Sequence, residues 1–225
     1  MLVFTTTVDI ALSRGGRVLP LPWRDERAVE AAKAAGATLT RSGLAGIERQ
    51  SGLRADTGHG WTLRPSSLTE LPEGTFLAIS SPNGATLSAA AAETGATVLA
   101  GCLRNASAVA AAAADLAGDG AVGIVPAGER WRDTPDKRLR PGIEELLGAG
   151  AIANAVPGRR APSAEAQLAA LTYRAAGARV PELVAESVSG RELVEAGVPT
   201  DVRLASDVDA STVVPVLADG VFTAR

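Results

Sequence analysis

Three short segments concentrate polar side chains where an apolar stretch gives way to a predicted helix. We call them the three junctions: Ser80–Gly84, Cys102–Asn105 and Ala127–Arg130. The free N–H groups at a helix N-terminus attract anions, so each junction is a potential anion site. In a parallel sheet the carboxyl ends of the strands share one edge, where ligands collect. The structural alternative is that these residues only cap helices and form turns, as serine and asparagine commonly do.

Two adjacent glutamates, Glu144 and Glu145, fall in the first turn of the helix predicted after Pro141. Mg²⁺ prefers hard carboxylate oxygens and keeps several of its waters, so one of this pair could bind it together with Glu129. The alternative interpretation is the helix dipole, which favours an acid in the first turn by about 0.3–1 kcal/mol. The sequence leaves both interpretations open.

A thiol mechanism is a further possibility, because Cys102 follows a predicted strand near a helix N-terminus that would lower its pKa. No histidine is near it in sequence, and the chain's one histidine, His59, lies in a glycine-rich stretch. We therefore expect Cys102 to be a buried structural thiol. Walker A and G-x-G-x-x-G motifs are absent from the sequence, which argues against the usual nucleotide-binding sites.

Composition narrows the classes of partner. The 225 residues carry a net charge of −3, and aromatic residues make up 3%. This combination favours neither nucleic-acid binding nor attraction to an anionic membrane. Apolar runs are shorter than the ~20 residues of a membrane helix. We expect a cytoplasmic protein that binds a small molecule, and its alanine-rich surface leaves room for homo-oligomer contacts.

The order of predicted elements indicates an α/β fold, a three-layer α/β/α arrangement with a mixed, largely parallel sheet. Predicted strands are Arg17–Leu21, Thr75–Ile79, Thr97–Cys102, Ala121–Val125, Val202–Leu204 and Val213–Leu217. Predicted helices include Arg24–Ala35, Ala85–Thr94, Ala106–Leu116, one from Pro141 and one from Ser163 to Ala176. Residues Arg41–Glu70 are predicted to form a long irregular loop. We expect one domain over residues 1–225, with a weak lobe boundary near Pro157–Pro162.

Several sequence blocks resemble one known family. They are FTTTVDIAL near the start, SPNG, GCLRNASAVA, VPAGERW, PGIEELLGAGAI and the C-terminal SGRELVEAGVPTDVRLASDVDASTVVPVLADGVF. In order and spacing they are similar to the Mg²⁺-dependent 2-phosphosulfolactate phosphatases, the ComB family. The resemblance implies hydrolysis of (R)-2-phospho-3-sulfolactate to 3-sulfolactate and phosphate, with Mg²⁺ as cofactor and a small anionic phosphoester as partner.

The resemblance also implies roles for individual residues. The amides at the junctions would hold oxyanions of the substrate, and an arginine would pair with them bidentately. The substrate-binding candidates are Ser81, Asn83, Gly84, Arg104, Asn105, Gly128 and Arg130. The candidate metal ligands are Glu144 and Glu145, and the candidate catalytic carboxylates are Glu129 and Glu145.

The N-terminal block departs from the family pattern, which opens with a strand reading Val-Ile-Asp-Val-Leu-Arg-Ala-Thr-Thr-Thr. Here Thr5–Thr7 match the threonines, Val3 stands at the arginine position, and the aspartate would precede Met1. A strand-end carboxylate is an obvious metal ligand or base. Its loss predicts the alternative function, a non-catalytic or truncated homologue that binds small anions.

Overall fold

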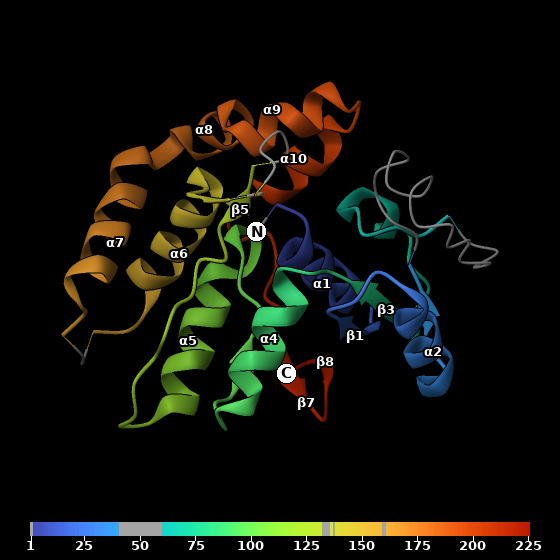
Figure 1. Ribbon diagram of the computed structural model, residues 1–225. Helices are drawn as coiled ribbons and strands as arrows, with labels where there is room; N and C mark the ends of the chain where they lie inside the picture. The colour runs from blue at the N-terminus through green and yellow to red at the C-terminus, as the bar shows by residue number, and fades with distance from the viewer. Residues whose placement is uncertain (1, 41–59, 132–135, 137, 159–160) are drawn as a thin grey trace. The chain divides into compact units, whose positions relative to one another are not determined.

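A computed structural model describes residues 2–40, 60–131, 136, 138–158 and 161–225 (Figure 1). The chain divides into two compact units. The sheet unit comprises Val3–Ala100 and Val213–Arg225, and the helical unit comprises Gly101–Thr212 together with Leu2. Pro157, at the lobe boundary expected from sequence, lies inside the helical unit. His59 and most of the Arg41–Glu70 loop lie outside the described residues.

The sheet unit is built on six strands in the order β2-β3-β1-β8-β7-β4. Their bounds are β1 Arg17–Leu21, β2 Thr38–Leu39, β3 Phe76–Ser80, β4 Val98–Leu99, β7 Pro215–Ala218 and β8 Val221–Ala224. The pairs β1/β3 and β2/β3 are parallel, whereas β1/β8, β7/β8 and β4/β7 are antiparallel. The predicted α/β class with a mixed sheet is confirmed.

Helices cover both faces of this sheet. Leu21 of β1 and Ala78 of β3 pack in one cluster with Ala28 and Ala32 of α2 (Glu26–Ala35). Val18 points to the opposite face, because successive strand residues alternate, and its register partner is Phe222. The ring of Phe4 in α1 (Phe4–Ser13) meets Phe222 edge to face at 6.3 Å. The three-layer arrangement is therefore confirmed for the sheet unit.

The strand directions overturn one expectation about the junctions. Following the three antiparallel pairings from β1 through β8 and β7 shows that β4 runs opposite to β1 and β3. The carboxyl ends of β3 and β4 therefore point to opposite edges of the sheet. Residues 121–125, predicted as a third strand, form no strand. The prediction that three successive parallel strands deliver the junctions to one edge is wrong.

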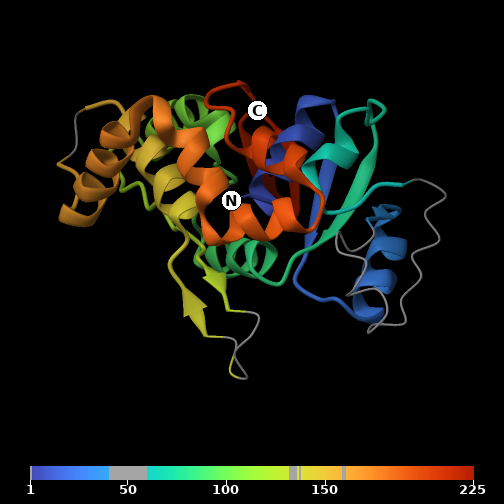
Figure 2. The same cartoon turned by 90° about the horizontal axis from the view of Figure 1, so that it is seen from above.

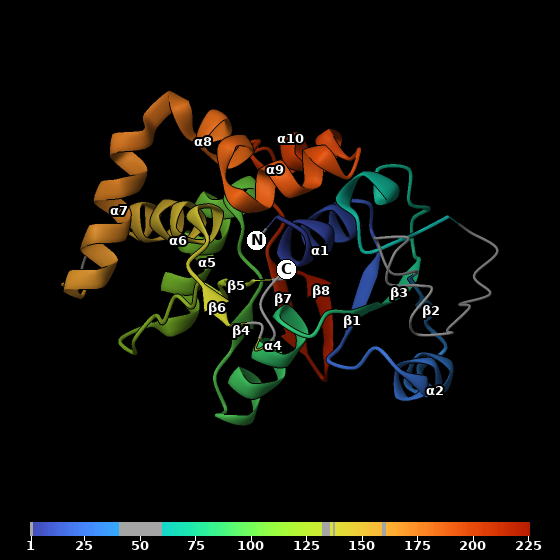
Figure 3. The same ribbon diagram turned by 45° about the horizontal axis from the view of Figure 1, so that its top comes forward.

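The helical unit contains a β-hairpin and six α-helices among its described residues. These are β5 Glu129–Arg130, β6 Leu139–Arg140, α5 Ala106–Ala117, α6 Ile143–Ala155, α7 Ala164–Ala176, α8 Val180–Glu186, α9 Val188–Glu195 and α10 Pro199–Ala205. Figure 1 shows α5, α6 and α7 side by side, and Figure 3 shows the shorter helices α8 to α10 that follow. The hairpin extends from the N-terminal end of α6 (Figure 2).

Two further segments that sequence reasoning placed in strands are helical. Val202–Leu204 lies in α10, where Pro199 occupies the first turn, a position at which its missing N–H costs nothing. Thr5–Thr7, matched to the end of the family's first strand, lie in α1. Two helix ends fall close to the predicted bounds: Gly36 ends α2 in a left-handed conformation, and Ser163 caps the start of α7. No helix among the described residues is both long and apolar enough to cross a membrane.

Candidate active site

The β5–β6 hairpin brings two of the predicted site residues to the start of α6. Glu129 lies directly opposite Arg140 in the antiparallel register, and Arg130 lies opposite Leu139. Gly128 precedes the hairpin with φ +69°, in the region where glycine has no steric penalty. A side chain there would also approach the Arg140 carbonyl oxygen to 3.3 Å. Gly128 therefore shapes the backbone that positions Glu129.

The start of α6 folds both glutamates of the acidic pair back toward the helix N-terminus. Gly142 is the N-cap residue and supplies no side-chain cap. A Cβ atom on Gly142 would lie 3.1 Å from Glu144 Oε1 and 3.0 Å from Glu145 Cγ. Glu145 Oε2 accepts a hydrogen bond from the Ala127 backbone N–H at 3.3 Å, which ties the third junction to α6.

Glu144 has an unmatched polar atom. Its side chain is buried, with 1% of the residue exposed, and Oε2 has no hydrogen-bond partner. A buried carboxyl oxygen without a partner is costly, so native structures rarely keep one without a role. A hard cation would satisfy this oxygen, and the donor set therefore fits the Mg²⁺ that the resemblance implies. Among the described residues, no three His, Cys, Asp or Glu side chains form a metal cluster.

Glu129 is electrostatically coupled to the acidic pair. Burial raises its pKa above the ordinary value of 4.5, and the negative charges of Glu145 and Glu144 raise it further. The backbone N–H of Arg130 opposes this shift by hydrogen bonding to Glu129 Oε2 at 3.4 Å. The charges of Glu144 and Glu145 therefore reach Glu129, although the three do not form a metal cluster among the described residues, and Glu129 retains its proton to higher pH than a free glutamate.

Sequence reasoning missed Arg140. It is 95% buried, its Nη2 donates to Ser189 Oγ at 2.8 Å, and its guanidinium lies 5.3 Å from the Trp131 ring centre. Nε is buried without a hydrogen-bond partner. Arg140 stands in a polar loop before Pro141, and no motif or spacing marks it. Its burial is the only signal, and burial becomes visible only in the fold.

The polar side chains of the second junction, in contrast, form hydrogen bonds with other residues of the helical unit. Arg104 Nη1 donates to the Leu204 carbonyl oxygen at 3.2 Å and lies 3.7 Å from Asp207 Oδ2. Asn105 Oδ1 accepts from the Cys102 backbone N–H at 2.9 Å, inside a fully buried turn. Cys102 is itself buried, as expected for a structural thiol. These contacts position α5.

An acid from the C-terminal block occupies the N-terminus of α5. The Asp209 carboxylate accepts from the Ser107 backbone N–H at 2.9 Å and from Ser107 Oγ at 2.7 Å. Asp209 holds φ +51° while its own N–H donates to the Leu103 carbonyl oxygen. The helix N-terminus predicted to hold a substrate oxyanion is thus already capped by the chain's own carboxylate.

The first junction lies in the sheet unit, away in sequence from the carboxylates. Ser81 Oγ accepts from the Gly84 N–H at 3.3 Å, and Asn83 forms the N-cap of α4 (Gly84–Glu93) without a side-chain cap. A Cβ atom on Gly84 would overlap the Phe4 ring at 2.1 Å. Close packing of α4 on α1 therefore requires glycine there. The substrate-binding role predicted for these residues stays a prediction.

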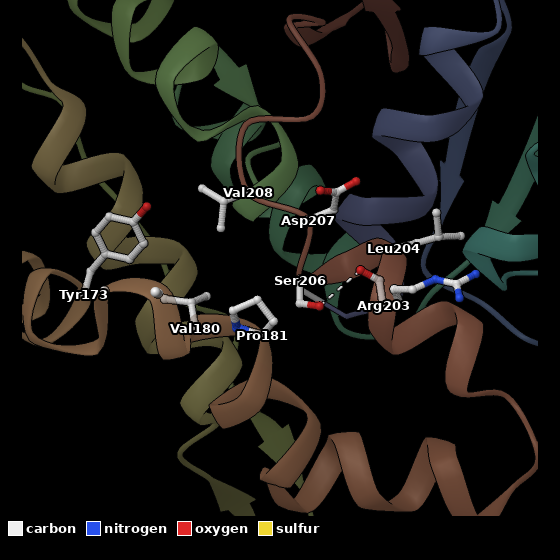
Figure 4. A pocket seen from close by; sticks show the side chains of 10 residues that line it. Tyr173, Val180, Pro181, Arg203, Leu204, Ser206, Asp207 and Val208 are labelled. Atoms are coloured by element: carbon white, nitrogen blue, oxygen red, sulfur yellow. Dashed lines mark hydrogen bonds between the residues drawn. The ribbon is translucent and has the colours of Figure 1, made fainter.

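The helical unit also contains a cleft of about 540 Å³, whose wall mixes apolar residues with polar ones that include Arg203 and Ser206 (Figure 4). Tyr173, Val180, Pro181 and Val208 line it together with the polar Asp207. The pKa of Tyr173 is raised, by burial first and by the charge of Asp209 second. The cleft contains none of the site residues predicted from sequence.

Comparison with known proteins agrees with the resemblance. No curated protein matches the chain. The family model described as 2-phosphosulpholactate phosphatase matches residues 1–220, almost the whole length. The carboxylate site on β5 and α6 lies within the matched range. The chain belongs to the 2-phosphosulpholactate phosphatase family.

Proposed function

We propose that this protein hydrolyses (R)-2-phospho-3-sulfolactate to 3-sulfolactate and phosphate in a Mg²⁺-dependent reaction. Family membership supports a phosphoric monoester hydrolase. The observation that carries the metal dependence is the buried Glu144 Oε2 atom, which has no hydrogen-bond partner. Glu144, with Glu145 beside it, would hold the ion. When bound, Mg²⁺ would neutralise charge on the phosphoryl oxygens, the main requirement of phosphoryl transfer.

Glu129 is proposed as the proton donor. Water attacks phosphorus, the bond between phosphorus and the ester oxygen breaks, and Glu129 gives its proton to that oxygen. The proton lost by the attacking water restores Glu129. An alkoxide is a poor leaving group, so this proton transfer assists bond cleavage, and a carboxyl with a raised pKa suits the task. Gly128 and the hairpin fix its position.

The test is phosphate release from 2-phospho-3-sulfolactate, measured with Mg²⁺ and after chelation. We expect turnover that disappears with EDTA and returns when Mg²⁺ is restored. A matched control is Glu195→Gln, which removes an exposed carboxylate from α9 and should leave the rate unchanged. Absence of turnover on three-carbon phosphoesters would contradict the proposal. Tight phosphate binding without turnover or metal dependence would support the alternative, a non-catalytic anion-binding protein.

A further inference from the structure

Arg140 carries a buried positive charge that the described residues do not balance. The residue is 5% exposed, and Nε has no hydrogen-bond partner. No carboxylate of the described residues lies within ion-pair distance of it. Glu129 faces it across the hairpin, yet the pKa of Glu129 is raised rather than lowered. An uncompensated buried charge is strongly unfavourable, and an anion bound beside Arg140 would relieve that cost.

Two contacts fix the guanidinium in place. Ser189 Oγ accepts from Arg140 Nη2, and Ser189 is itself 8% exposed in the first turn of α9. The helix start is held by Ser187, whose Oγ accepts from the Gly190 N–H at 2.9 Å. A Cβ atom on Gly190 would overlap the Val184 carbonyl oxygen at 2.1 Å. The α9 start is therefore tightly positioned against α8.

The second contact is the Trp131 ring, 5.3 Å from the guanidinium carbon. Aromatic faces attract cations, and such a contact uses none of the guanidinium N–H groups, which leaves them to bind a ligand. Ser189 accepts the hydrogen bond from Arg140, so its own hydroxyl hydrogen remains available to donate. Arg140 and Ser189 together therefore present at least two donors from β6 and α9.

We propose that Arg140, positioned by Ser189 and Trp131, binds an oxyanion group of the ligand beside the Glu144 carboxylate. This inference rests on the proposed function in taking the anion to belong to the phosphoester substrate. Phosphate, sulfonate and carboxylate share the chemistry that a guanidinium fork recognises. Arg140 and Glu144 flank the three residues 141–143 in the chain, and we take both to serve one ligand that carries anionic oxygens and a bound cation.

The experiment is isothermal titration of inorganic phosphate, and separately of 3-sulfolactate, into metal-free protein. We expect Arg140→Gln to weaken binding of at least one anion about 10- to 100-fold. Arg140→Lys keeps the charge but loses the fork, so it should recover part of the affinity. The matched control is Arg138→Gln, which removes an exposed arginine two residues away and should bind like the wild type.

The two anions separate the possible sources of the oxyanion. Loss of phosphate binding alone assigns the phosphoryl group to Arg140, and loss of 3-sulfolactate binding alone assigns the sulfonate or carboxylate. Wild-type affinity for both anions in Arg140→Gln overturns the proposal, as does a wild-type protein that binds neither. If Arg140→Gln does not fold, Ser189→Ala takes its place. It should weaken binding several-fold, and unchanged affinity contradicts the positioning role.

These outcomes are distinct from a failure of the proposed function. Glu144→Gln should lose turnover while still binding the anion in metal-free buffer. An inactive wild type whose anion binding depends on Arg140 would remove the phosphatase assignment and leave the anion site. An active wild type whose anion binding does not depend on Arg140 would support the phosphatase assignment and remove the anion site at Arg140.

Discussion

Two helix N-termini of the helical unit, those of α5 and α6, both carry candidate site residues but differ in how their polar groups are satisfied. Asp209 caps α5, Asn105 closes the preceding turn, and Arg104 is bound to the Leu204 carbonyl oxygen. At α6 no side chain caps the first turn, and buried atoms of Arg140 and Glu144 have no partner.

The difference distinguishes polar residues that stabilise the fold from polar residues that bind a ligand. A polar cluster whose donors and acceptors are matched internally stabilises the fold and gains little from a ligand. A cluster that leaves opposite charges buried and unmatched gains much more when a ligand completes it. The count of polar residues at a junction is therefore a poor guide to function, and the unmatched atoms are the better one.

Among the substitutions that test this contrast, Glu129→Gln should cause the largest loss of phosphatase activity. General acid catalysis contributes about 10²–10⁴-fold, and a glutamine cannot supply the proton. The wild-type rate should fall as pH rises through the raised pKa of Glu129, because the donor is then ionised. The measurement is the pH profile of phosphate release for both proteins. A variant that keeps the wild-type rate and pH profile would exclude Glu129 as the donor.

The raised pKa of Glu129 also predicts how the stability of the protein changes with pH. Because the folded-state pKa of Glu129 is raised, its contribution to stability is present below about pH 4.5 and is lost as pH rises through the raised value. Glu129→Gln removes this dependence. Denaturant unfolding at several pH values should therefore show a flatter profile for the variant over that range.

Gly142→Ala should produce an intermediate effect. The new Cβ atom would meet both carboxylate side chains of α6 at 3.0–3.1 Å, although the extended backbone at this residue tolerates alanine. We expect Mg²⁺ affinity to fall roughly tenfold, as when the support of a metal ligand is disturbed. Gly123→Ala, where no atom lies within 4 Å of the added Cβ, is the control. Equal affinity in the two variants would show that the carboxylates do not need the space at Gly142.

Asp209→Ala should have the smallest effect on catalysis, and it should mainly lower the stability of the fold. Loss of the α5 cap should lower the free energy of unfolding by about 0.5–2 kcal/mol, measured by denaturant titration. Turnover per folded molecule should stay within about twofold of the wild type, since the contacts of Asp209 are internal. Asp209→Asn keeps an acceptor and the preference for positive φ, so it should be milder. A large loss of turnover in a folded Asp209→Ala protein would make α5 part of the active site.

Local signals in the sequence predicted much of the fold. Gly36 marks the end of α2, Ser163 marks the start of α7, and the apolar run at 17–21 forms β1. The run at 121–125 was misread, because a short apolar segment carries no information about whether a partner strand is available. Val202–Leu204 was misread for the same reason, and Pro199 was the overlooked signal of a helix start.

The candidate site was only half predictable. A proline shortly before a predicted helix, followed by two acids, indicated Glu144 and Glu145, and the resemblance supported them. Arg140, Ser189 and Asp209 could not be found, because each acts through a contact with a residue 49 or 102 positions away. Such partners are chosen by tertiary packing, which neither periodicity nor spacing along the chain encodes.

The most direct test of the central claim is Mg²⁺ binding by the wild type and by Glu144→Gln, measured by calorimetric titration in the presence of 3-sulfolactate and phosphate. Glu195→Gln is titrated alongside as the exposed control. The account predicts that the wild type and the control bind Mg²⁺ equally, and that Glu144→Gln binds it at least about tenfold more weakly. Equal affinity in all three proteins would contradict the account, because the unmatched oxygen of Glu144 would then hold no metal.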